Sequence, residues 1–573
     1  MSYLRSFART MGNVPQNEPM EGMEKNNTGV GYSFQTTPLQ RLRSFLILGA
    51  EGGTFYVRER QLTKENAQTL VDLLESGRGV DVVKMIEEVS VSGASFRVDA
   101  CLFGLAMAAH TGDAATKAAV REAFTKVVRI PTHLFTFVAF SESIAQATRG
   151  GTGWGRAMRR LVSSWYNERS AANLALMVTK YVRRGGWSHV DLLRLAHTKA
   201  DSEATGAVLK YVAKGWDGVR ELVTDDALEQ LEPTQREALQ FIVDVEAAAC
   251  LSDPAADSER MAALIRERSG LVREHVPTPL LNSAVVWRAL LEKMPAMAMV
   301  RNLGKMSAIG LFDGEGGSAA EAHVLATLRN RALLRRARLH PFAILLALKT
   351  YRQGRGDKGK LSWPVNKRIA DALDSAFYLS FATGEGKGSK GEGGGDGRSD
   401  KSVMLALDVS GSMGTMVMGS SISCREASAA MAMVAVNTMR NVEVVAFTSS
   451  ITNIDLRVQR GMKLDRVVSN ISGMPFGGTD CALPMLYAME RKRRVDAFVV
   501  YTDSETWFGD VHPCQALQRY RRAMNMPQAK LIVVGMASNG FTIADPNDRG
   551  MLDVVGFDAS APEVMQAFID GAI

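Results

Sequence analysis

Two carboxylates and three hydroxyls lie beside short apolar runs in the last third of the chain. Asp408, Ser410 and Ser412 belong to the stretch DVSGSM, which follows the apolar residues MLAL. Thr479 lies in the loop PFGGTD, and Asp503 closes the run FVVYTD. An all-oxygen set with no nearby histidine or cysteine suits a hard divalent cation and not zinc. The set therefore predicts a Mg²⁺ site, which Mn²⁺ could also occupy, with room for an anionic ligand from a partner to complete the metal shell.

The stretch DVSGS alone also fits a plain strand-to-helix turn, because serine and glycine are common there. A later threonine and a later aspartate, each at the end of its own apolar run, favour the metal site. Kinase and nucleotidase functions would need a phosphate-binding glycine loop with a lysine, and we find none. No nucleophile and base are arranged for catalysis, so we expect a binding protein and not an enzyme.

A second cluster of functional residues is basic. Between Trp154 and Arg220 the sequence carries twelve Lys or Arg residues and five Asp or Glu residues. The apolar stripe around Leu174 predicts a helix from which Lys180, Arg183 and Arg184 project away from the core, free to meet phosphates. Tryptophans are interleaved with these cations; they could stack on unpaired bases, but packing between helices is the more common role.

A helix is predicted to begin at His189, directly after the Gly185-Gly186 turn. Ser188 and Asp191 have the spacing of a capping box. The free N–H groups of a helix N-terminus can hold a phosphate, and His189 in the first turn could donate to it or stack on a base. An ordinary surface histidine is the alternative.

Two domains of different kinds must position these clusters. After residue 402, the runs VMLALDVS, VEVVAF, DAFVVYTD and AKLIVVGM alternate with helical stretches, which predicts an α/β domain with a doubly wound parallel sheet. Its ligands should bind outside the carboxyl ends of the strands, where the candidate metal ligands fall. Before the linker, apolar residues recur at helical spacing for about 350 residues, which predicts an all-α array of stacked, HEAT-like helix pairs.

The predicted boundaries follow from these patterns. We expect a flexible leader over residues 1–30, the helical domain over 31–383, a flexible Gly/Lys-rich loop over 384–402 and the α/β domain over 403–573. Of 573 residues, 46% are hydrophobic, enough for several cores. The last domain carries 15 basic and 17 acidic residues, whereas the first 402 residues carry 53 and 44. The excess positive charge lies in the helical part and indicates a polyanionic partner.

No segment is apolar and long enough to span a membrane, and the N-terminus lacks the pattern of a secretory signal. The five cysteines show no CxxC pair, so we expect them to be reduced and mostly buried. The chain is therefore predicted to be cytoplasmic.

Long motifs resemble the Ro 60 kDa autoantigen family, in which a TROVE helical-repeat domain precedes a von Willebrand factor A domain. They include TPLQRLRSFLILGAEGGTFY, GWSHVDLLRLAH, HPFAILLALKTY, LALDVSGSM, GGTDCALPM and NGFTIADPNDRGMLD. The resemblance implies a monomeric ring of helical repeats closed by the A domain. It also implies that Asp408, Ser410, Ser412, Thr479 and Asp503 form a metal-ion-dependent adhesion site. This sequence differs from the family pattern in its long leader and in the Gly384–Ser402 insertion, and both differences point to a bacterial or phage member of the family.

The resemblance further implies an RNA partner. In the family, the basic outer surface binds small noncoding Y RNA, and the central hole accepts single-stranded 3′ ends of misfolded RNA. Bacterial members work in RNA quality control with an exoribonuclease such as polynucleotide phosphorylase. The matching residues here are Arg156, Arg159, Arg160, Lys180, Arg183, Arg184, His189, Arg194, His197 and Lys199. The alternative is a metal-dependent protein-interaction module whose helical domain binds protein.

Overall fold

The structure is a computed structural model that describes most of the chain. The described residues are 13–49, 59–95, 97–268, 270–314, 317–337, 339–356, 359–381, 400–417, 420–454, 457–475, 477–556, 558 and 560–573. Residues 1–12 of the predicted leader and residues 384–399 of the predicted Gly/Lys-rich loop lie outside this set. We call residues 36–381 the helical domain and residues 400–573 the C-terminal domain.

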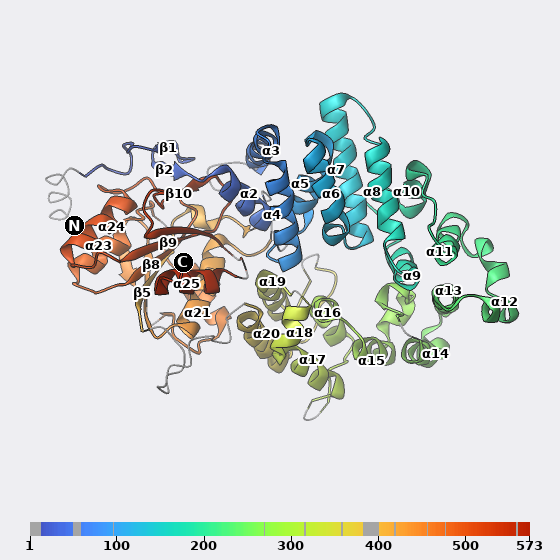
Figure 1. Ribbon diagram of the computed structural model, residues 1–573. Helices are drawn as coiled ribbons and strands as arrows, with labels where there is room; N and C mark the ends of the chain where they lie inside the picture. Colours follow the sequence, from blue (N-terminus) through green and yellow to red (C-terminus); the bar gives the residue numbers. More distant parts are fainter. Residues whose placement is uncertain are drawn as a thin grey trace, which may run out of the picture.

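The helical domain is an arc of antiparallel helices (Figure 1). α4 packs on α6 and α5 packs on α7. Each of these helices therefore contacts the equivalent helix of the following pair, as in a stacked array of helix pairs. The helices are α2 (Pro38–Leu48), α3 (Glu59–Glu75), α4 (Gly79–Ser92), α5 (Asp99–Thr111), α6 (Ala114–Val127), α7 (Pro131–Arg149), α8 (Arg156–Asn167), α9 (Ala171–Lys180), α10 (His189–Ala196), α11 (Glu203–Lys214), α12 (Asp225–Gln230), α13 (Pro233–Ala249), α14 (Pro254–Glu267), α15 (Ala284–Glu292), α16 (Ala296–Ala308), α17 (Ala319–Arg329), α18 (Arg331–Arg336), α19 (Pro341–Arg352) and α20 (Lys367–Ser380).

The C-terminal domain is built on a central sheet whose strand order is β11-β9-β8-β5-β6-β7. The four predicted strands are confirmed as β5 (Ser402–Asp408), β6 (Asn441–Phe447), β8 (Ala497–Thr502) and β9 (Lys530–Gly535). Two further members are β7 (Ile451–Asn453) and β11 (Met551–Val555). The helices are α21 (Cys424–Thr438), α22 (Leu464–Ser472), α23 (Leu483–Glu490), α24 (Pro513–Ala523) and α25 (Ala561–Asp570).

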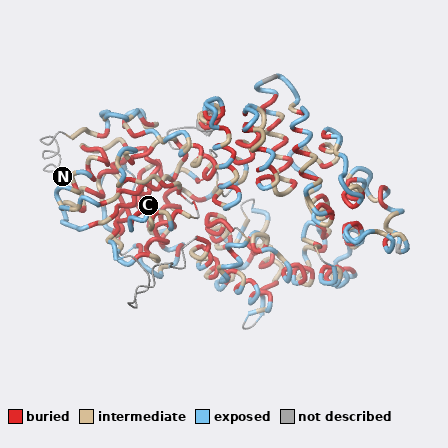
Figure 2. Tube along the Cα trace, viewed as in Figure 1, coloured by how far each residue is buried: buried red, intermediate tan, exposed pale blue. Residues whose placement is uncertain are grey.

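The sheet differs from the all-parallel prediction at one edge. β7 pairs with β6 in the antiparallel direction, with Phe447 opposite Ile451. Only three residues separate these two strands, which is enough for a hairpin and far too few for the helical crossover that a parallel pair needs. The strands β5, β8 and β9 are buried on both faces, as their continuous apolar runs predicted (Figure 2).

Both ends of the helical arc meet the C-terminal domain. At the first end, Arg43 of α2 forms an ion pair with Asp558 at 2.9 Å. At the last end, Lys349 of α19 lies 2.8 Å from Glu426 of α21. The two ends of the arc also meet each other, because His340 Nε2 donates to the carbonyl of Ala94 at 3.0 Å. The helical repeats and the C-terminal domain therefore form a closed ring (Figure 1).

The predicted flexible leader is wrong for its described part, residues 13–30. β1 (Met23–Lys25) pairs with β2 (Tyr32–Gln35), and β2 pairs with β10 (Phe541–Thr542) of the C-terminal domain. Gln16 is fully buried, and its side-chain amide donates to Asp480 Oδ1 at 2.7 Å and to the carbonyl of Val511 at 2.9 Å. These partners are more than 450 residues away in sequence, so no local pattern could reveal them.

Two other expectations can be compared with the described residues. All five cysteines are free, and only Cys250 is exposed. Among the described residues, no helix has the length and hydropathy needed to cross a membrane.

Candidate functional site

The predicted metal ligands gather at the carboxyl ends of neighbouring strands. Asp408 is the last residue of β5, and Asp503 follows β8, which pairs with β5 in parallel. Parallel neighbours end at the same edge of a sheet, so the two carboxylates meet there. All five predicted ligands are buried, with 0 to 3% of each residue exposed.

Hydrogen bonds fix the DVSGSM loop around its carboxylate. The Ser410 amide donates to Asp408 Oδ1 at 2.9 Å, and the Thr502 hydroxyl donates to Asp408 Oδ2 at 2.7 Å. The hydroxyls of Ser410 and Ser412 lie 3.0 Å apart, and Ser412 also bonds to the Asp503 carboxylate. The structure thus brings together four of the predicted ligands through direct contacts.

Thr479 joins the cluster through the loop that follows Asp503. Its carbonyl accepts hydrogen bonds from the amide of Trp507 at 3.2 Å, the amide of Phe508 at 3.0 Å and the hydroxyl of Thr506 at 3.1 Å. Its own hydroxyl is buried and has no hydrogen-bond partner within the described structure. A buried hydroxyl without a partner is costly, and a cation at this position would satisfy it.

A third carboxylate, that of Glu505, lies at this site and was not predicted from the sequence. It is fully buried, and its amide donates to Asp503 Oδ1 at 3.2 Å. Burial raises the pKa of Asp503 well above its usual value, and the negative charges of Glu505 and then Asp408 raise it further. The pKa of Asp408 is also raised, mainly by burial. The signal was present in the sequence, since Glu505 lies two residues after Asp503, but DxSxS with Thr and Asp does not require it.

A buried guanidinium, also not predicted from the sequence, bonds to the backbone of this loop. Arg425 of α21 is 3% exposed and donates to the carbonyls of Val409, Ser410 and Met474. When all four groups are ionised, Arg425 and the three carboxylates carry a net charge of minus two. A divalent cation balances that charge and suits the oxygen donors, so the residues present fit Mg²⁺ or Mn²⁺.

No group of three or more His, Cys, Asp or Glu side chains with metal-binding geometry occurs in the described ranges of the chain. A cation at this site would therefore depend on the hydroxyls of Ser410, Ser412 and Thr479 as well as on the carboxylates. That dependence is expected of a site for a hard cation that keeps some of its waters.

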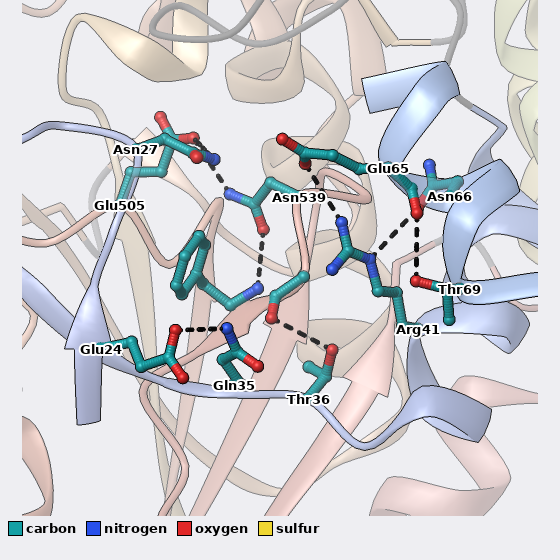
Figure 3. A network of polar contacts seen from close by, with 12 residues as sticks. Glu24, Asn27, Gln35, Thr36, Arg41, Glu65, Asn66, Thr69, Glu505 and Asn539 are labelled. Atoms are coloured by element: carbon teal, nitrogen blue, oxygen red, sulfur yellow. Dashed lines mark hydrogen bonds and ion pairs between the residues drawn. The ribbon is translucent and has the colours of Figure 1, made fainter. Parts of the chain in front are cut away.

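The N-terminal segment supports the loop that carries Asp503 and Glu505. Asn27 and Asn539 each donate to Glu505 Oε1 at 3.1 Å (Figure 3). Asn539 also donates to the carbonyl of Asp503 at 2.7 Å. Arg41 of α2 lies in the same view, bonded to Glu65 at 3.1 Å. Residues from three distant parts of the chain thus meet beside the candidate metal site.

The predicted basic cluster is exposed on α8, in the hairpin that follows α9, and on and directly after α10. α8 buries an apolar face that includes Leu161 and Trp165, and its cations point to solvent. α8 also packs on α10, so the two sets of cations are neighbours. We define the basic strip as the exposed cations Arg156, Arg159, Arg160, Arg183, Arg184, Arg194 and Lys199. None of these seven forms an ion pair with another described residue.

The helix that was expected to carry Arg183 and Arg184 ends earlier, at Lys180. The two arginines form β3 (Arg183–Arg184), which pairs with β4 (Trp187–Ser188) in a tight hairpin. Gly185 and Gly186 turn the hairpin with φ of 58° and 86°, a region that glycine adopts without strain. Lys180 is half-buried and lies 4.0 Å from Glu274, so it is less available than the strip itself, whereas His197 is exposed.

The prediction that His189 contacts RNA is wrong for this structure. The capping box of Ser188 and Asp191 is confirmed, but His189 is only 3% exposed. Its ring packs against Phe135, 4.9 Å away between centroids, and its Nδ1 lies 2.8 Å from the Tyr166 hydroxyl. In the first turn of α10, this side chain faces the neighbouring helices and not the solvent.

Burial of His189 has a consequence for stability. Desolvation lowers the pKa of His189 from 6.5 to about 4, so the unfolded chain takes up a proton that the folded chain does not. The contribution of neutral His189 to the free energy of unfolding should be fully present above pH 6.5. It should decrease by about 3 kcal/mol as the pH falls towards 4. Urea unfolding of the His189→Asn variant should show a correspondingly flatter pH dependence over this range. The control is His197→Asn, an exposed histidine eight residues later, which should retain the slope of the wild type.

Comparisons with known proteins agree with this architecture. Residues 25–350 match the TROVE domain family, and residues 402–569 match the Ro60 vWA domain family. RNA-binding protein RO60 of Caenorhabditis elegans is 35% identical, with 96% of this chain and 91% of the relative covered. RNA-binding protein RO60 of Deinococcus radiodurans is 35% identical, with 98% of both chains covered.

A solved structure is similar over nearly the whole chain. The crystal structure of the Deinococcus radiodurans RO (RSR) protein matches with a TM-score of 0.65 and 36% identity, covering 94% of this chain and all of that one. The helical arc, the C-terminal sheet and the two domain matches thus point to one family. The chain belongs to the Ro family, in which a TROVE domain is followed by a von Willebrand A domain.

Proposed function

We propose that this protein binds structured RNA through the basic strip on α8–α10. The observation that carries the proposal is that seven exposed cations, on or close to the packed helices α8 and α10, form no ion pair among the described residues. Such cations can neutralise phosphates without first breaking contacts of their own, and release of the counterions of RNA then drives binding. Relatives that are named RNA-binding proteins support the same conclusion.

In this proposal the RNA is a small noncoding Y-like RNA on the outer surface, and the ring accepts single-stranded 3′ ends of misfolded RNA. The protein acts in RNA quality control as a monomeric, cytoplasmic scaffold without chemistry of its own. An exoribonuclease of the polynucleotide phosphorylase kind is the proposed partner that degrades the RNA.

The C-terminal domain has a separate role in the proposal. Asp408, Ser410, Ser412, Thr479 and Asp503 would hold Mg²⁺, with Glu505 supplying a third negative charge. The bound cation would attract an anionic group of a partner protein, while Arg425 and Thr502 orient the loop that carries the ligands.

The test is the salt dependence of RNA binding by the wild-type protein. A structured RNA with a single-stranded 3′ tail should bind, and neutralisation of about five phosphates should weaken the binding about 500-fold between 50 and 200 mM salt. Fluorescence anisotropy of the labelled RNA measures the affinity and its dependence on salt concentration. Absence of a salt-sensitive complex would reject the proposal and favour the alternative, a metal-dependent assembly module whose helical domain binds protein.

A further inference from the structure

A pocket of 490 Å³ lies between α16 and α19, away from the basic strip and from the candidate metal site. Its volume is within the usual range for small-molecule sites. One wall is a face of α16 whose residues recur at helical spacing, namely Met297, Val300, Arg301, Gly304 and Lys305. The facing wall comes from Ala343, Leu346, Ala347 and Thr350 of α19. Both helices belong to the part of the ring that meets α4 and α5 through His340 (Figure 1).

An aromatic pair, Tyr351 and Trp363, is part of the pocket lining. The Trp363 ring packs directly on Gly304, where a Cβ atom would lie only 2.8 Å from a ring carbon. The indole N–H of Trp363 donates to the carbonyl of Tyr351 at 2.9 Å, and the two rings stack with centroids 6.2 Å apart. These contacts hold the indole in place, and Trp363 is 9% exposed, so only a small part of the ring is open to the pocket.

The charge of the pocket has one sign. Its lining includes Arg273, Arg301 and Lys305, and none of the described residues that line it is acidic. Arg301 is exposed and forms no ion pair with the described residues, while the nearest carboxylate to Arg273 is 3.8 Å away. Burial, and then the positive charge of Arg273, lower the pKa of Lys305. Lys305 Nζ donates to Asn282 Oδ1 at 2.7 Å, and an anion near Lys305 and Arg273 would relieve the repulsion between their charges.

The rest of the lining is apolar and only partly covered. Met297, Leu346 and Leu361 each keep part of their surface in contact with solvent. A ligand that is anionic at one end and flat and apolar at the other would cover this surface and meet the cations at the same time. Three cations suit a phosphate dianion better than a single carboxylate, and a flat nucleobase could cover the partly exposed Leu346 and Leu361 and the accessible part of Trp363.

We propose that the pocket between α16 and α19 binds a nucleoside monophosphate, with the phosphate among Arg273, Arg301 and Lys305 and the base against Leu346, Leu361 and Trp363. The same chemistry is present in a free nucleotide and in a nucleotide of single-stranded RNA. Only the second source rests on the proposed function. The pocket and the basic strip are tested by different ligands, so either proposal can fail while the other holds.

The experiment is calorimetric titration of the full-length protein with AMP. We expect one saturable site, weakened at least tenfold by Arg301→Ala and by Lys305→Ala, since each removes a charge-assisted hydrogen bond. Arg288→Ala is the matched control: this exposed arginine of α15 does not line the pocket, and its loss should leave the affinity unchanged. Ala347→Phe fills the pocket without changing its charge and should abolish the binding.

Four outcomes would overturn the proposal. The first two are no saturable binding of AMP and equal affinity of the wild-type protein and Ala347→Phe. The third is inorganic phosphate binding as tightly as AMP, which would leave the base without a role. The fourth is displacement of AMP by laurate at a lower concentration than AMP, which would identify the pocket as a site for an acyl anion. When AMP binding is confirmed, competition by an octaadenylate identifies an RNA nucleotide as the natural ligand, and lack of competition identifies a free nucleotide.

Discussion

Reversing the charge of Arg159, Arg183 and Arg184 to glutamate in one variant is expected to weaken binding of a structured RNA by about 1,000-fold at moderate salt. Each change removes a cation and adds a repulsive charge beside the phosphates, so three positions change the local charge by six units. All three side chains are exposed, and the fold should therefore survive. Anisotropy titrations at several salt concentrations measure the effect, and the slope of log affinity against log salt should become shallower by about three.

The control for this experiment applies the same change in net charge elsewhere. Arg491, Arg494 and Arg522 are exposed cations of the C-terminal domain, and their conversion to glutamate lowers the total charge equally. This control should weaken RNA binding only a few-fold, through the long-range field that salt screens. Equal loss in both variants would mean that net charge alone drives association, and the basic strip would not be the binding surface.

The second large effect is expected at the candidate metal site. Asp408→Asn keeps the shape of the side chain and removes its charge, so it should abolish the stabilisation that Mg²⁺ gives the wild type. That stabilisation is about 2.7 kcal/mol at a concentration one hundred times the dissociation constant. Without Mg²⁺, the Asp408→Asn variant should be more stable than the wild type. Asp408, Asp503 and Glu505 are three carboxylates buried close together, and the substitution removes one of their negative charges. Urea unfolding with EDTA and with Mg²⁺ measures both states.

Asp553→Asn is the matched control for this prediction. Asp553 lies in β11, and burial raises its pKa to about 7, but it is not among the predicted ligands. Its variant should keep the whole response to Mg²⁺. RNA binding by Asp408→Asn should equal that of the wild type, because the basic strip is on α8–α10. Loss of RNA binding in a folded Asp408→Asn protein would contradict the separation of the two sites.

Several features followed from local sequence patterns because local physics determines them. The continuous apolar runs of β5, β6, β8 and β9 identified buried strands, and the spacing of Ser188 and Asp191 identified the start of α10. The gathering of Asp408 and Asp503 was also predictable, since parallel strands end at a common edge. In each case the residues that decide the outcome are close in sequence or follow from the regular geometry of a βα unit.

The tertiary structure decided the features that depend on distant contacts. The residues next to His189 in sequence would be the same at a surface position and at a buried one. Only the packing of Phe135 and Tyr166 against its ring determines that it is buried. Glu505 joins the metal site because Asn27 and Asn539, from opposite ends of the chain, hold its carboxylate (Figure 3). Distant contacts also hold the described part of the leader, because the side chain of Gln16 bonds to Asp480 and Val511.

The sequence by itself determined the two domain types, the strands, and the chemistry of the oxygen and basic clusters, because periodicity and residue type act over a few residues. The tertiary structure alone decided which side chains are exposed, how the ring closes through His340 and Ala94, and where α16 and α19 leave a cationic pocket. These depend on the free energy of burying surfaces from segments hundreds of residues apart, which no local pattern records.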